Sequence, residues 1–460
     1  MTFRNLLYRA AVLPGLLSFT GLSAQTNSTV LAPKPPMGWN SWDSFGPSVR
    51  EDEVKANADV MATKLAKFGW QYVVVDIEWY QPDAHAHGYI PRGRVTMDSY
   101  GRFVPSPNRF PSATSGAGFK PLADYVHSKG LKFGIHIMRG IPREAVDKNL
   151  PIEGTKFHAA EVADKVNVCK WAGMEDTYGV DMTKPGAQAY YDSIARLYAL
   201  WGVDFVKADD MSRPFRGPEI HALSVALKKT GRPIVLSLSP GPAPIEKYED
   251  LKANAQMWRI SNDFWDRWID IKEQFDRAHR WENDSHPGGW PDADMLPLGH
   301  IAIRGERGDD RKSLLTHDEQ ITLMTLWVIF RSQLMFGGDL VTSDDFTFSL
   351  LTNADVLAVN QESTHGHEVS RKDGVIVWTS EGSNSARYAA IFNSSDAAQN
   401  PSFSWQSIGL AGSNYGVKDL WAGKTPAATV ADGKGVHASL APHASILFRL
   451  TDLAPANRIP

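Results

Sequence analysis

The nine residues VDFVKADDM, at positions 203–211, combine the pattern of a buried strand with charged side chains that could react. The segment starts with mostly apolar or aromatic residues and then reaches Lys207 and the adjacent Asp209 and Asp210. Charges at the end of a buried strand cost free energy unless they are paired or used in chemistry. Because side chains alternate along a strand, Lys207 and Asp209 share a face, and a lysine there keeps a carboxyl ionised, as a nucleophile requires. The segment therefore predicts a reactive carboxylate.

Other segments end in the same way, with polar or aromatic side chains. They carry Asn40, Trp42 and Asp43; Asp76, Glu78 and Trp79; His136 and Arg139; Ser237 and Ser239; Arg259 and Asp263; and Trp290, Asp292 and Asp294. Alternation places Asp76 and Glu78 on one face of their strand, and Arg259 and Asp263 on one face of theirs. A second carboxyl two strands from Asp209 would act as acid and base, and tryptophans would wall the pocket. Two carboxylates among hydroxyl-binding groups favour the retaining hydrolysis of glycosides.

These side chains need a scaffold that gathers the strand ends, and the chain alternates strand-like and helix-like segments. The strand candidates are residues 36–42, 72–80, 131–140, 203–210, 232–240, 257–263, 288–295 and 333–340. Helical patterns cover residues 51–69, 119–130, 185–202 and 217–231, and each stops at a glycine. We therefore expect an α/β protein with a (β/α)8 TIM barrel at residues 31–362. An open doubly wound sheet is the competing fold, but no glycine-rich dinucleotide fingerprint follows the first strand.

The sequence pattern changes after the predicted barrel. Short strand-like runs, separated by Gly, Ser, Asn and Asp, replace the helices. This pattern is typical of an antiparallel β-sandwich. We expect such a domain at residues 363–452.

Composition and the N-terminus limit the partners and the location. The net charge is −4 over 460 residues, without long basic or acidic runs, which argues against nucleic acid or a membrane surface as a partner. Cys169 is the only cysteine, so an intramolecular disulfide and an all-cysteine metal site are excluded. Residues 1–24 combine two arginines, an apolar run and small residues, which predicts a signal peptide and a secreted or periplasmic protein.

Four motifs carry a family resemblance. The segments PPMGWNSWDSFG, VDFVKADD, WRISND and HPGGWPDADML resemble glycoside hydrolase family 27, the α-galactosidase and α-N-acetylgalactosaminidase family. The resemblance implies a retaining exo-hydrolase of terminal α-D-galactosides that uses no metal and no cofactor, with an oligosaccharide or polysaccharide as substrate. It implies Asp209 as nucleophile and Asp263 as general acid/base. The sugar-contacting positions that it implies are Trp42, Asp76, Lys207, Arg259 and Asp294.

The departures from the family pattern concern the substrate pocket. Ile77 replaces an acidic residue that grips galactose in many α-galactosidases, and Glu78 replaces a cysteine. His136 stands where a tyrosine is common, and Ser239 where a glutamate is expected. We include Glu78, His136 and Ser239 among the substrate-binding candidates. A β-L-arabinopyranosidase, an α-N-acetylgalactosaminidase and an α-glucan-cleaving enzyme are therefore alternatives to an α-galactosidase.

Other interpretations of the same residues stay open. Asp210 could be the working carboxyl, Arg259 and Asp263 could form a structural ion pair, and Asp292 and Asp294 could belong to a tight turn. The sequence HAHG at residues 85–88 has the spacing of a metal ligand pair but falls in a loop. A non-catalytic carbohydrate-binding protein would be expected to lose one carboxylate, and a metal-dependent hydrolase would need histidines at several strand ends. The oligomeric state is left open.

Overall fold

The computed structural model describes Met1 and residues 30–410, 414–422 and 428–453. Apart from Met1, the predicted signal peptide lies outside the described residues. The chain divides into residues 1–30 and a compact unit of residues 31–460. Within the described ranges, no helix has the length and apolar character needed to cross a bilayer.

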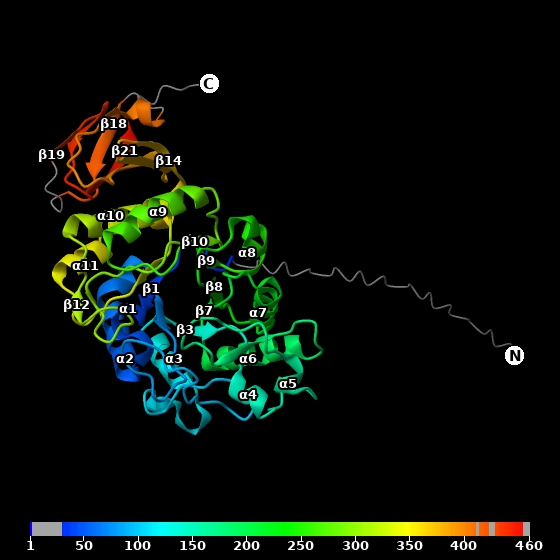
Figure 1. The fold of residues 1–460 in the computed structure, drawn as a ribbon. Coiled ribbons are helices and arrows are strands. Elements are labelled where there is room, and N and C mark those ends of the chain that lie inside the picture. Colours follow the sequence, from blue (N-terminus) through cyan, green and yellow to red (C-terminus); the bar gives the residue numbers. More distant parts are fainter. Residues whose placement is uncertain (2–29, 411–413, 423–427, 454–460) are drawn as a thin grey trace. The chain divides into compact units, whose positions relative to one another are not determined.

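Eight parallel strands form the barrel, and each one corresponds to a predicted strand segment (Figure 1). They are β1 (Met37–Asn40), β2 (Tyr72–Val75), β3 (Lys132–Met138), β7 (Phe205–Asp209), β8 (Val235–Leu238), β9 (Met257–Arg259), β10 (Trp290–Asp292) and β13 (Leu334–Phe336). From β1 to β10 each strand pairs with the next in this order, and β13 pairs with β1. A parallel bridge between Leu296 and Phe336 links the segment after β10 to β13 and closes the ring. The predicted (β/α)8 barrel is confirmed.

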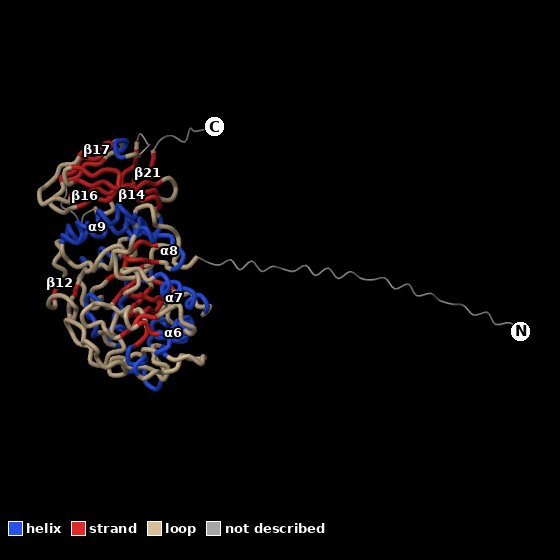
Figure 2. The backbone as a smooth tube through the Cα atoms, turned by 45° about the vertical axis from the view of Figure 1, so that its right-hand side comes forward, coloured by secondary structure: helices blue, strands red, loops and turns tan. Residues whose placement is uncertain are grey.

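Helices cover the outside of the strands (Figure 2). The four predicted helices are found as α2 (Glu51–Val60), α3 (Lys120–Ser128), α6 (Ala187–Trp201) and α7 (Gly217–Lys229). Beyond α2, the chain continues through the π-helical turn η2 (Met61–Leu65) and the 3-10 turn η3 (Ala66–Phe68). The other α-helices are α1 (Trp42–Phe45), α4 (Arg143–Asp147), α5 (Ala159–Val162), α8 (Tyr248–Asn254), α9 (Trp268–Trp281), α10 (His317–Phe330), α11 (Asp345–Leu351) and α12 (Ala354–Glu362). The other 3-10 helices are η1 (Gly46–Ser48), η4 (Pro111–Gly116), η5 (Ile245–Lys247) and η6 (Trp405–Ile408).

The local sequence explains where these elements form and stop. The strand β2, with the sequence YVVV, is buried throughout, as expected for a parallel strand covered on both faces. Gly69 and Gly202 have φ angles of 98° and 82°, in the left-handed region that glycine adopts easily, and they end the helical segments before them. The short sheets β4–β6–β5 and β11–β12 lie in the loops that follow barrel strands, and the alternating pattern did not predict them. Their strands are β4 (Ile141–Pro142), β5 (Ala163–Asp164), β6 (Thr177–Val180), β11 (His300–Ile301) and β12 (Arg311–Lys312).

The C-terminal part consists of two antiparallel sheets, as predicted. The larger sheet has the order β14–β15–β16–β21–β18, and the smaller one the order β17–β20–β19. The predicted boundary after residue 362 falls between the end of α12 and the start of β14. The strands are β14 (Thr364–Lys372), β15 (Val375–Glu381), β16 (Ala386–Asn393), β17 (Ser402–Ser404), β18 (Tyr415–Asp419), β19 (Ala428–Ala431), β20 (Gly435–Ser439) and β21 (Ser445–Asp452).

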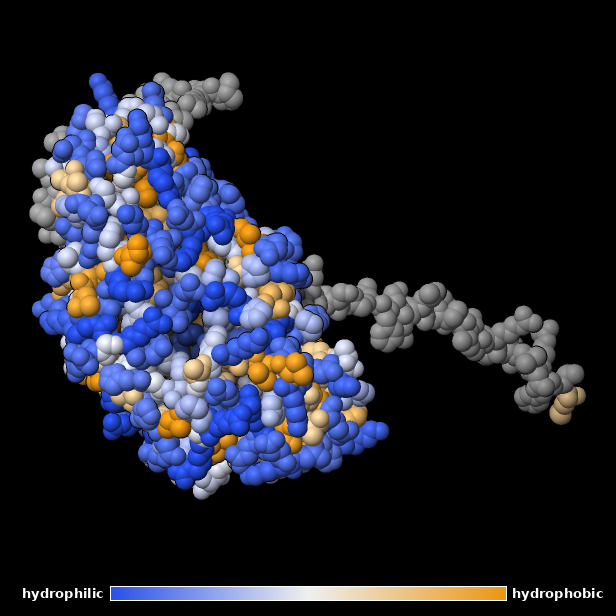
Figure 3. Space-filling view, viewed as in Figure 1, coloured by the Kyte–Doolittle hydropathy of each residue, from blue (hydrophilic) through white to orange (hydrophobic). Residues whose placement is uncertain are grey.

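Helix α10 of the barrel contacts the sandwich directly. The indole nitrogen of Trp421 donates to the Thr325 hydroxyl at 2.9 Å, and the Thr322 hydroxyl donates to the His443 carbonyl at 2.6 Å. The face of the molecule shown in Figure 3 is largely hydrophilic, with apolar residues in separate small groups.

Candidate active site

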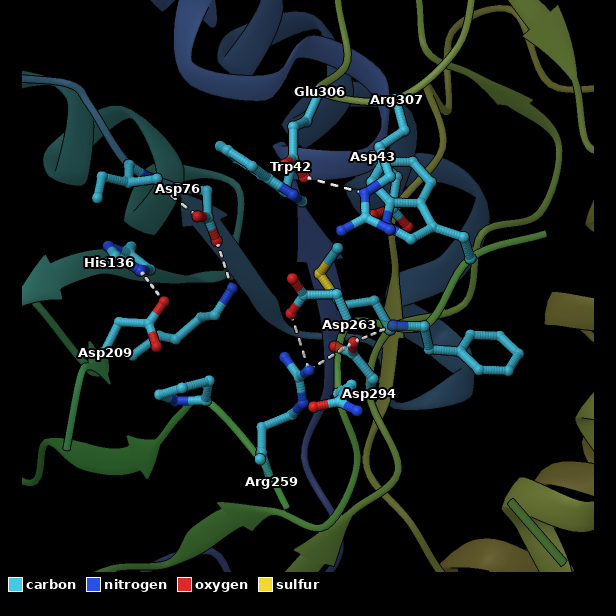
Figure 4. A pocket seen from close by; sticks show the side chains of 18 of the residues that line it. Trp42, Asp43, Asp76, His136, Asp209, Arg259, Asp263, Asp294, Glu306 and Arg307 are labelled. Atoms are coloured by element: carbon cyan, nitrogen blue, oxygen red, sulfur yellow. Dashed lines mark hydrogen bonds and ion pairs between the residues drawn. The ribbon is translucent and has the colours of Figure 1, made fainter. Parts of the chain in front are cut away.

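A cavity of about 490 Å³ opens at the carboxyl ends of the barrel strands. Eight of the predicted site residues line it, namely Trp42, Asp76, His136, Lys207, Asp209, Arg259, Asp263 and Asp294. Figure 4 shows Asp76, His136 and Asp209 on the left of the view, with Arg259, Asp263 and Asp294 below its centre. The barrel therefore gathers charged side chains from strands far apart in sequence into one pocket, at the end where barrel enzymes carry their active sites.

Asp209 ends β7 and is held by its neighbours as a carboxylate. His136 Nε2, from the adjacent strand β3, lies 3.1 Å from Asp209 Oδ2, and the Asp210 amide donates to Asp209 Oδ1 at 3.1 Å. Burial raises the pKa of Asp209, but the hydrogen bond and charge of His136, together with the charge of Lys207, outweigh burial and lower it. The group is thus ionised at neutral pH.

Lys207 is paired with Asp76 rather than with Asp209. Its Nζ lies 2.9 Å from Asp76 Oδ2, which also accepts a hydrogen bond from Asn40 Nδ2 at 2.7 Å. Burial raises the pKa of Asp76, but Lys207 and the other donors prevail and lower it to about 2. The expectation that Lys207 keeps Asp209 ionised holds only through its longer-range charge, since the direct partner of Asp209 is His136.

Arg259 joins two carboxyl groups on the other side of the pocket. Its Nη2 lies 3.0 Å from Asp263 Oδ1 and 3.0 Å from Asp294 Oδ2. The Asp263 side chain is 52% exposed, whereas Asp294 is buried and also accepts a hydrogen bond from the Phe264 amide at 2.8 Å. Burial, and the nearby charge of Asp263, outweigh Arg259 and raise the pKa of Asp294 to about 6. The proposed ion pair of Arg259 and Asp263 therefore exists, and it lies within the pocket.

Asp210 occupies a different environment from Asp209. Arg139 Nε donates to Asp210 Oδ2 at 2.8 Å, and the same guanidinium donates to Glu219 at 2.7 Å. All three side chains are at most 5% exposed, and none of them lines the pocket. Asp210 therefore serves a buried structural ion pair, and Asp209 is the carboxyl of this strand that faces the cavity.

Asp292 lies beneath the pocket. Its Oδ1 accepts hydrogen bonds from Gln333 Nε2 and from the Asp294 amide, each at 2.8 Å. Asp294 has a φ angle of 84°, so the segment does turn tightly after β10, as one interpretation of these residues held. The turn directs the second aspartate into the cavity.

Two predicted substrate-binding residues, Glu78 and Ser239, do not line the cavity. Glu78 is fully buried, and its Oε1 accepts a hydrogen bond from Gln81 Nε2 at 3.1 Å. The expectation that Asp76 and Glu78 share a face is wrong because β2 ends at Val75, so strand alternation no longer applies to the residues that follow. Ile77 lines the pocket beside Asp76 instead. Ser239 is 1% exposed, and its hydroxyl lies near Asp209, where it contributes to the lowered pKa of that carboxyl.

Loop residues complete the pocket wall, and sequence reasoning did not identify them. Tyr89 stacks on Trp42 with ring centroids 5.9 Å apart, and Trp171 lines the cavity from the loop after β5. Glu306 and Arg307, from the loop between β11 and β12, form an ion pair at 3.6 Å at the upper edge of the view in Figure 4. Such residues come from irregular segments, where neither hydrophobic periodicity nor strand alternation gives a signal.

The residues HAHG lie in the long loop after β2, where His85 and His87 are exposed. In the part of the chain that the structure describes, no group of three or more His, Cys, Asp or Glu side chains is arranged to hold a metal ion. Cys169 is a buried free thiol.

Comparisons with family models and with known proteins point to the same family. The alpha galactosidase A family model matches residues 34–142 and 154–362, and the alpha galactosidase C-terminal beta sandwich model matches residues 372–450. The chain is 29% identical over 428 residues to alpha-galactosidase 2 of Arabidopsis thaliana, covering 92% of this chain and 90% of the relative.

Solved structures of higher similarity include a family 27 β-L-arabinopyranosidase from Geobacillus stearothermophilus. That structure has a TM-score of 0.87 and 49% sequence identity, covering 92% of this chain and 98% of the other. A variant of the same enzyme in complex with arabinose has a TM-score of 0.86 and 50% identity, covering 91% of this chain and 97% of the other.

Proposed function

Because this chain belongs to the α-galactosidase family of glycoside hydrolases, we propose that it preferentially removes terminal β-L-arabinopyranosyl residues from oligosaccharides or polysaccharides. β-L-Arabinopyranose is α-D-galactopyranose without the C6 group. The same pocket would therefore accept α-D-galactosides as slower substrates.

The observation that carries this proposal is Ile77 in the pocket wall. Ile77 is 4% exposed and lines the cavity directly after Asp76. An isoleucine neither donates nor accepts a hydrogen bond, so a C6 hydroxyl beside it would lose its contact with water without gaining a partner. A pentopyranose carries no such hydroxyl. The 49% identity to an enzyme described as a β-L-arabinopyranosidase supports the same choice of sugar.

The proposed mechanism is double displacement with retention at the anomeric carbon. Asp209 attacks the anomeric carbon and forms a covalent glycosyl-enzyme, while Asp263 gives its proton to the departing glycosidic oxygen. Asp263 then takes a proton from water, which attacks the same carbon and releases Asp209 and the free sugar. Two environments support these roles: the pKa of Asp209 is lowered, which favours a nucleophile, and Asp263 is half exposed, which gives it access to water.

A panel of nitrophenyl glycosides tests the choice of sugar. We expect kcat/KM for the β-L-arabinopyranoside to exceed that for the α-D-galactopyranoside by at least about tenfold, which corresponds to about 1.4 kcal/mol. The α-N-acetylgalactosaminide and α-glucoside serve as comparison substrates for the other family activities. A higher kcat/KM for the α-galactoside would overturn the proposed preference.

The second candidate function is that of an α-galactosidase. It is favoured by the matching family model and by the 29% identical plant relative, which is named an alpha-galactosidase. Both candidates use the same carboxylates, so they differ only in how the pocket accommodates the C5 substituent. The panel above separates them directly.

We also propose that the protein is exported. The support is the sequence of residues 1–24, with its two arginines, apolar run and small residues before Gln25. N-terminal sequencing of protein recovered outside the cytoplasm should show that the mature chain begins near Gln25. Recovery of the activity only from the cytoplasm, with Met1 intact, would contradict export.

A further inference from the structure

The carboxyl group of Asp43 lies in the pocket wall, and the mechanism above gives it no role. Asp43 lies in the short helix α1, directly after β1, and lines the cavity although it is only 2% exposed. Its main chain is fixed, because its carbonyl accepts a hydrogen bond from the Ala302 amide at 2.7 Å. Figure 4 shows it at the upper right of the pocket, next to Arg307 and Trp42.

Asp43 differs from the other carboxyl groups around it in having no partner. Asp76, Asp209 and Asp294 each bind a cation, a histidine or a main-chain amide, as described above. No hydrogen bond or ion pair of the Asp43 side chain is found among the described residues, and its Oδ2 is buried without any partner. Burying a polar group without a hydrogen bond costs free energy, and such exceptions in folded proteins call for a specific explanation.

The space around Asp43 is kept open by a glycine. A Cβ atom on Gly337, just after β13, would lie 1.8 Å from Asp43 Oδ2, so any larger residue there would displace the carboxyl group. The backbone of Gly337 is itself fixed, since its amide donates to the Leu296 carbonyl at 3.0 Å. The fold therefore holds an unpartnered carboxyl at the cavity wall in a defined position.

The surroundings of Asp43 favour the protonated form of its carboxyl group, which can donate a hydrogen bond. Burial raises its pKa well above the usual range, and the carboxyl groups of Asp294, Asp266 and Asp76 raise it further against the opposing charge of Lys207. A protonated carboxyl has one hydrogen to donate and remains an acceptor. Ionised carboxylates can only accept hydrogen bonds, whereas a protonated Asp43 can also donate one to a sugar hydroxyl.

We propose that Asp43 is a further substrate-binding residue, whose carboxyl group forms a hydrogen bond with a ring hydroxyl of the sugar in the cavity. This inference rests on the proposed function in assuming that the occupant is a pyranoside. It adds a residue to that site without altering the roles of Asp209 and Asp263.

The test combines Asp43 variants with deoxy substrates. Asp43→Ala should lower kcat/KM about 3- to 10-fold, the range for a neutral hydrogen bond, and Asp43→Asn should recover part of that loss because an amide also donates. Nitrophenyl glycosides lacking the 2-, 3- or 4-hydroxyl are then compared in parent and variant. For one of the three, the rate penalty of the missing hydroxyl should shrink at least about threefold in Asp43→Ala.

Stability separates a binding role from a structural one. Removing an unpartnered buried carboxyl should leave the Tm of Asp43→Ala equal to that of the parent or above it. The matched control is Asp339→Asn, since Asp339 is also buried but accepts hydrogen bonds from Asn57 at 2.9 Å and Thr342 at 2.6 Å and does not line the cavity. That variant should lower the Tm while its kcat/KM stays near the parent value.

Two results would overturn the proposal. One is an equal penalty for all three deoxy substrates in parent and Asp43→Ala, and the other is an arabinose complex in which Asp43 contacts water alone. The outcome is independent of the preferred sugar. If the parent prefers α-galactosides, the proposed specificity fails, and the same comparison with deoxygalactosides still decides the role of Asp43.

Discussion

At the scale of single residues, the aspartate carboxyl groups in the pocket are chemically identical but have different partners. Asp209 faces a histidine, Asp76 a lysine, and Asp263 an arginine at the exposed edge. Adjacent residues also diverge, because Asp209 lines the cavity while Asp210 binds a buried arginine. These differences in partner and burial give each carboxyl a separate role, and each role is testable by substitution.

Replacing Asp209 by Asn should remove the nucleophile. We expect kcat to fall by several orders of magnitude while the Tm stays close to that of the parent. In Asp209→Gly, which removes the whole side chain, azide or formate should restore part of the activity by entering the vacated space. The control is Asp210→Asn, which leaves Arg139 without one of its buried partners and should lower stability by about 3–5 kcal/mol. Near-normal turnover by Asp209→Asn would contradict the assignment.

Replacing Asp263 by Ala should affect substrates according to their leaving groups. Glycosides with poor leaving groups need protonation and should lose activity most, whereas nitrophenyl glycosides should lose far less. A uniform loss across leaving groups would indicate a sugar-binding or structural role. Proton NMR of the first-formed sugar completes the test, since the pairing of Asp209 with Asp263 requires retention, and inversion is incompatible with it.

Ile77 is the residue expected to control the choice of sugar. Ile77→Asp places a hydrogen-bond acceptor beside Asp76, so the ratio of kcat/KM for the α-galactoside to that for the β-L-arabinopyranoside should rise about tenfold or more. Ile77→Val, which keeps the wall apolar, is the matched control and should leave this ratio within about twofold. An unchanged ratio in Ile77→Asp would remove Ile77 from the account of specificity.

At the scale of elements, the end of a strand decides which side chains reach the pocket. Alternation holds within β7, where Lys207 and Asp209 both line the cavity. It fails after β2, because the strand ends at Val75 and the following turn brings Ile77 into the cavity and buries Glu78 behind it. The sequence patterns located these strands correctly, but the exact residue where a strand stops depends on tertiary contacts that the pattern does not contain.

The buried position of Glu78 predicts a pH-dependent stability. Burial and the nearby charge of Asp176 outweigh Arg109 and raise its pKa from 4.5 to about 9. Between these two values the folded protein binds more protons than the unfolded chain, so this group lowers the free energy of unfolding as the pH rises. In Glu78→Gln the group no longer titrates. The Tm of the variant should therefore match the parent near pH 4.5 and exceed it increasingly toward pH 8.5.

Thermal unfolding of both proteins across this pH range measures the effect. Asp76→Asn gives an opposite reference, because the pKa of Asp76 is lowered to about 2 and its stabilisation is lost only as the pH falls below about 4. A Tm difference between parent and Glu78→Gln that is constant from pH 4.5 to 8.5 would show that Glu78 is not the titrating group.

The sequence predicted the barrel strands and four of its helices because both leave strong periodic signals, apolar runs of four to eight residues and apolar positions at helical spacing. It missed β4 and β5, which have only two residues each and therefore show no periodic pattern. It also missed Tyr89, Trp171 and Arg307, which reach the pocket from loops. Their positions depend on how one loop packs on another, and local sequence patterns do not predict such packing.

At the scale of the whole unit of residues 31–460, the barrel and the sandwich share one hydrophobic core. Buried residues of the larger sandwich sheet belong to the same cluster as the barrel helices. Phe392 packs on Phe275 of α9 with ring centroids 5.0 Å apart, and Trp378 packs on Phe330 of α10 at 6.3 Å. A second, separate cluster fills the space between the two sandwich sheets. The larger sheet is therefore buried on both faces, with the barrel on one side and the smaller sheet on the other.

This shared core predicts that barrel and sandwich unfold together. Trp421 is fully buried in the common cluster, and its indole nitrogen donates to Thr325 of α10, so Trp421→Ala should cost about 3–5 kcal/mol. Calorimetry should show one transition in the parent and one transition, at lower temperature, in the variant, with loss of activity on heating following the same curve. Trp421→Phe, which keeps an aromatic ring but loses the hydrogen bond, should show a smaller shift. Two resolved transitions, of which only the first moves in Trp421→Ala, would instead mean that the sandwich unfolds on its own and that the interface adds little to the stability of the barrel.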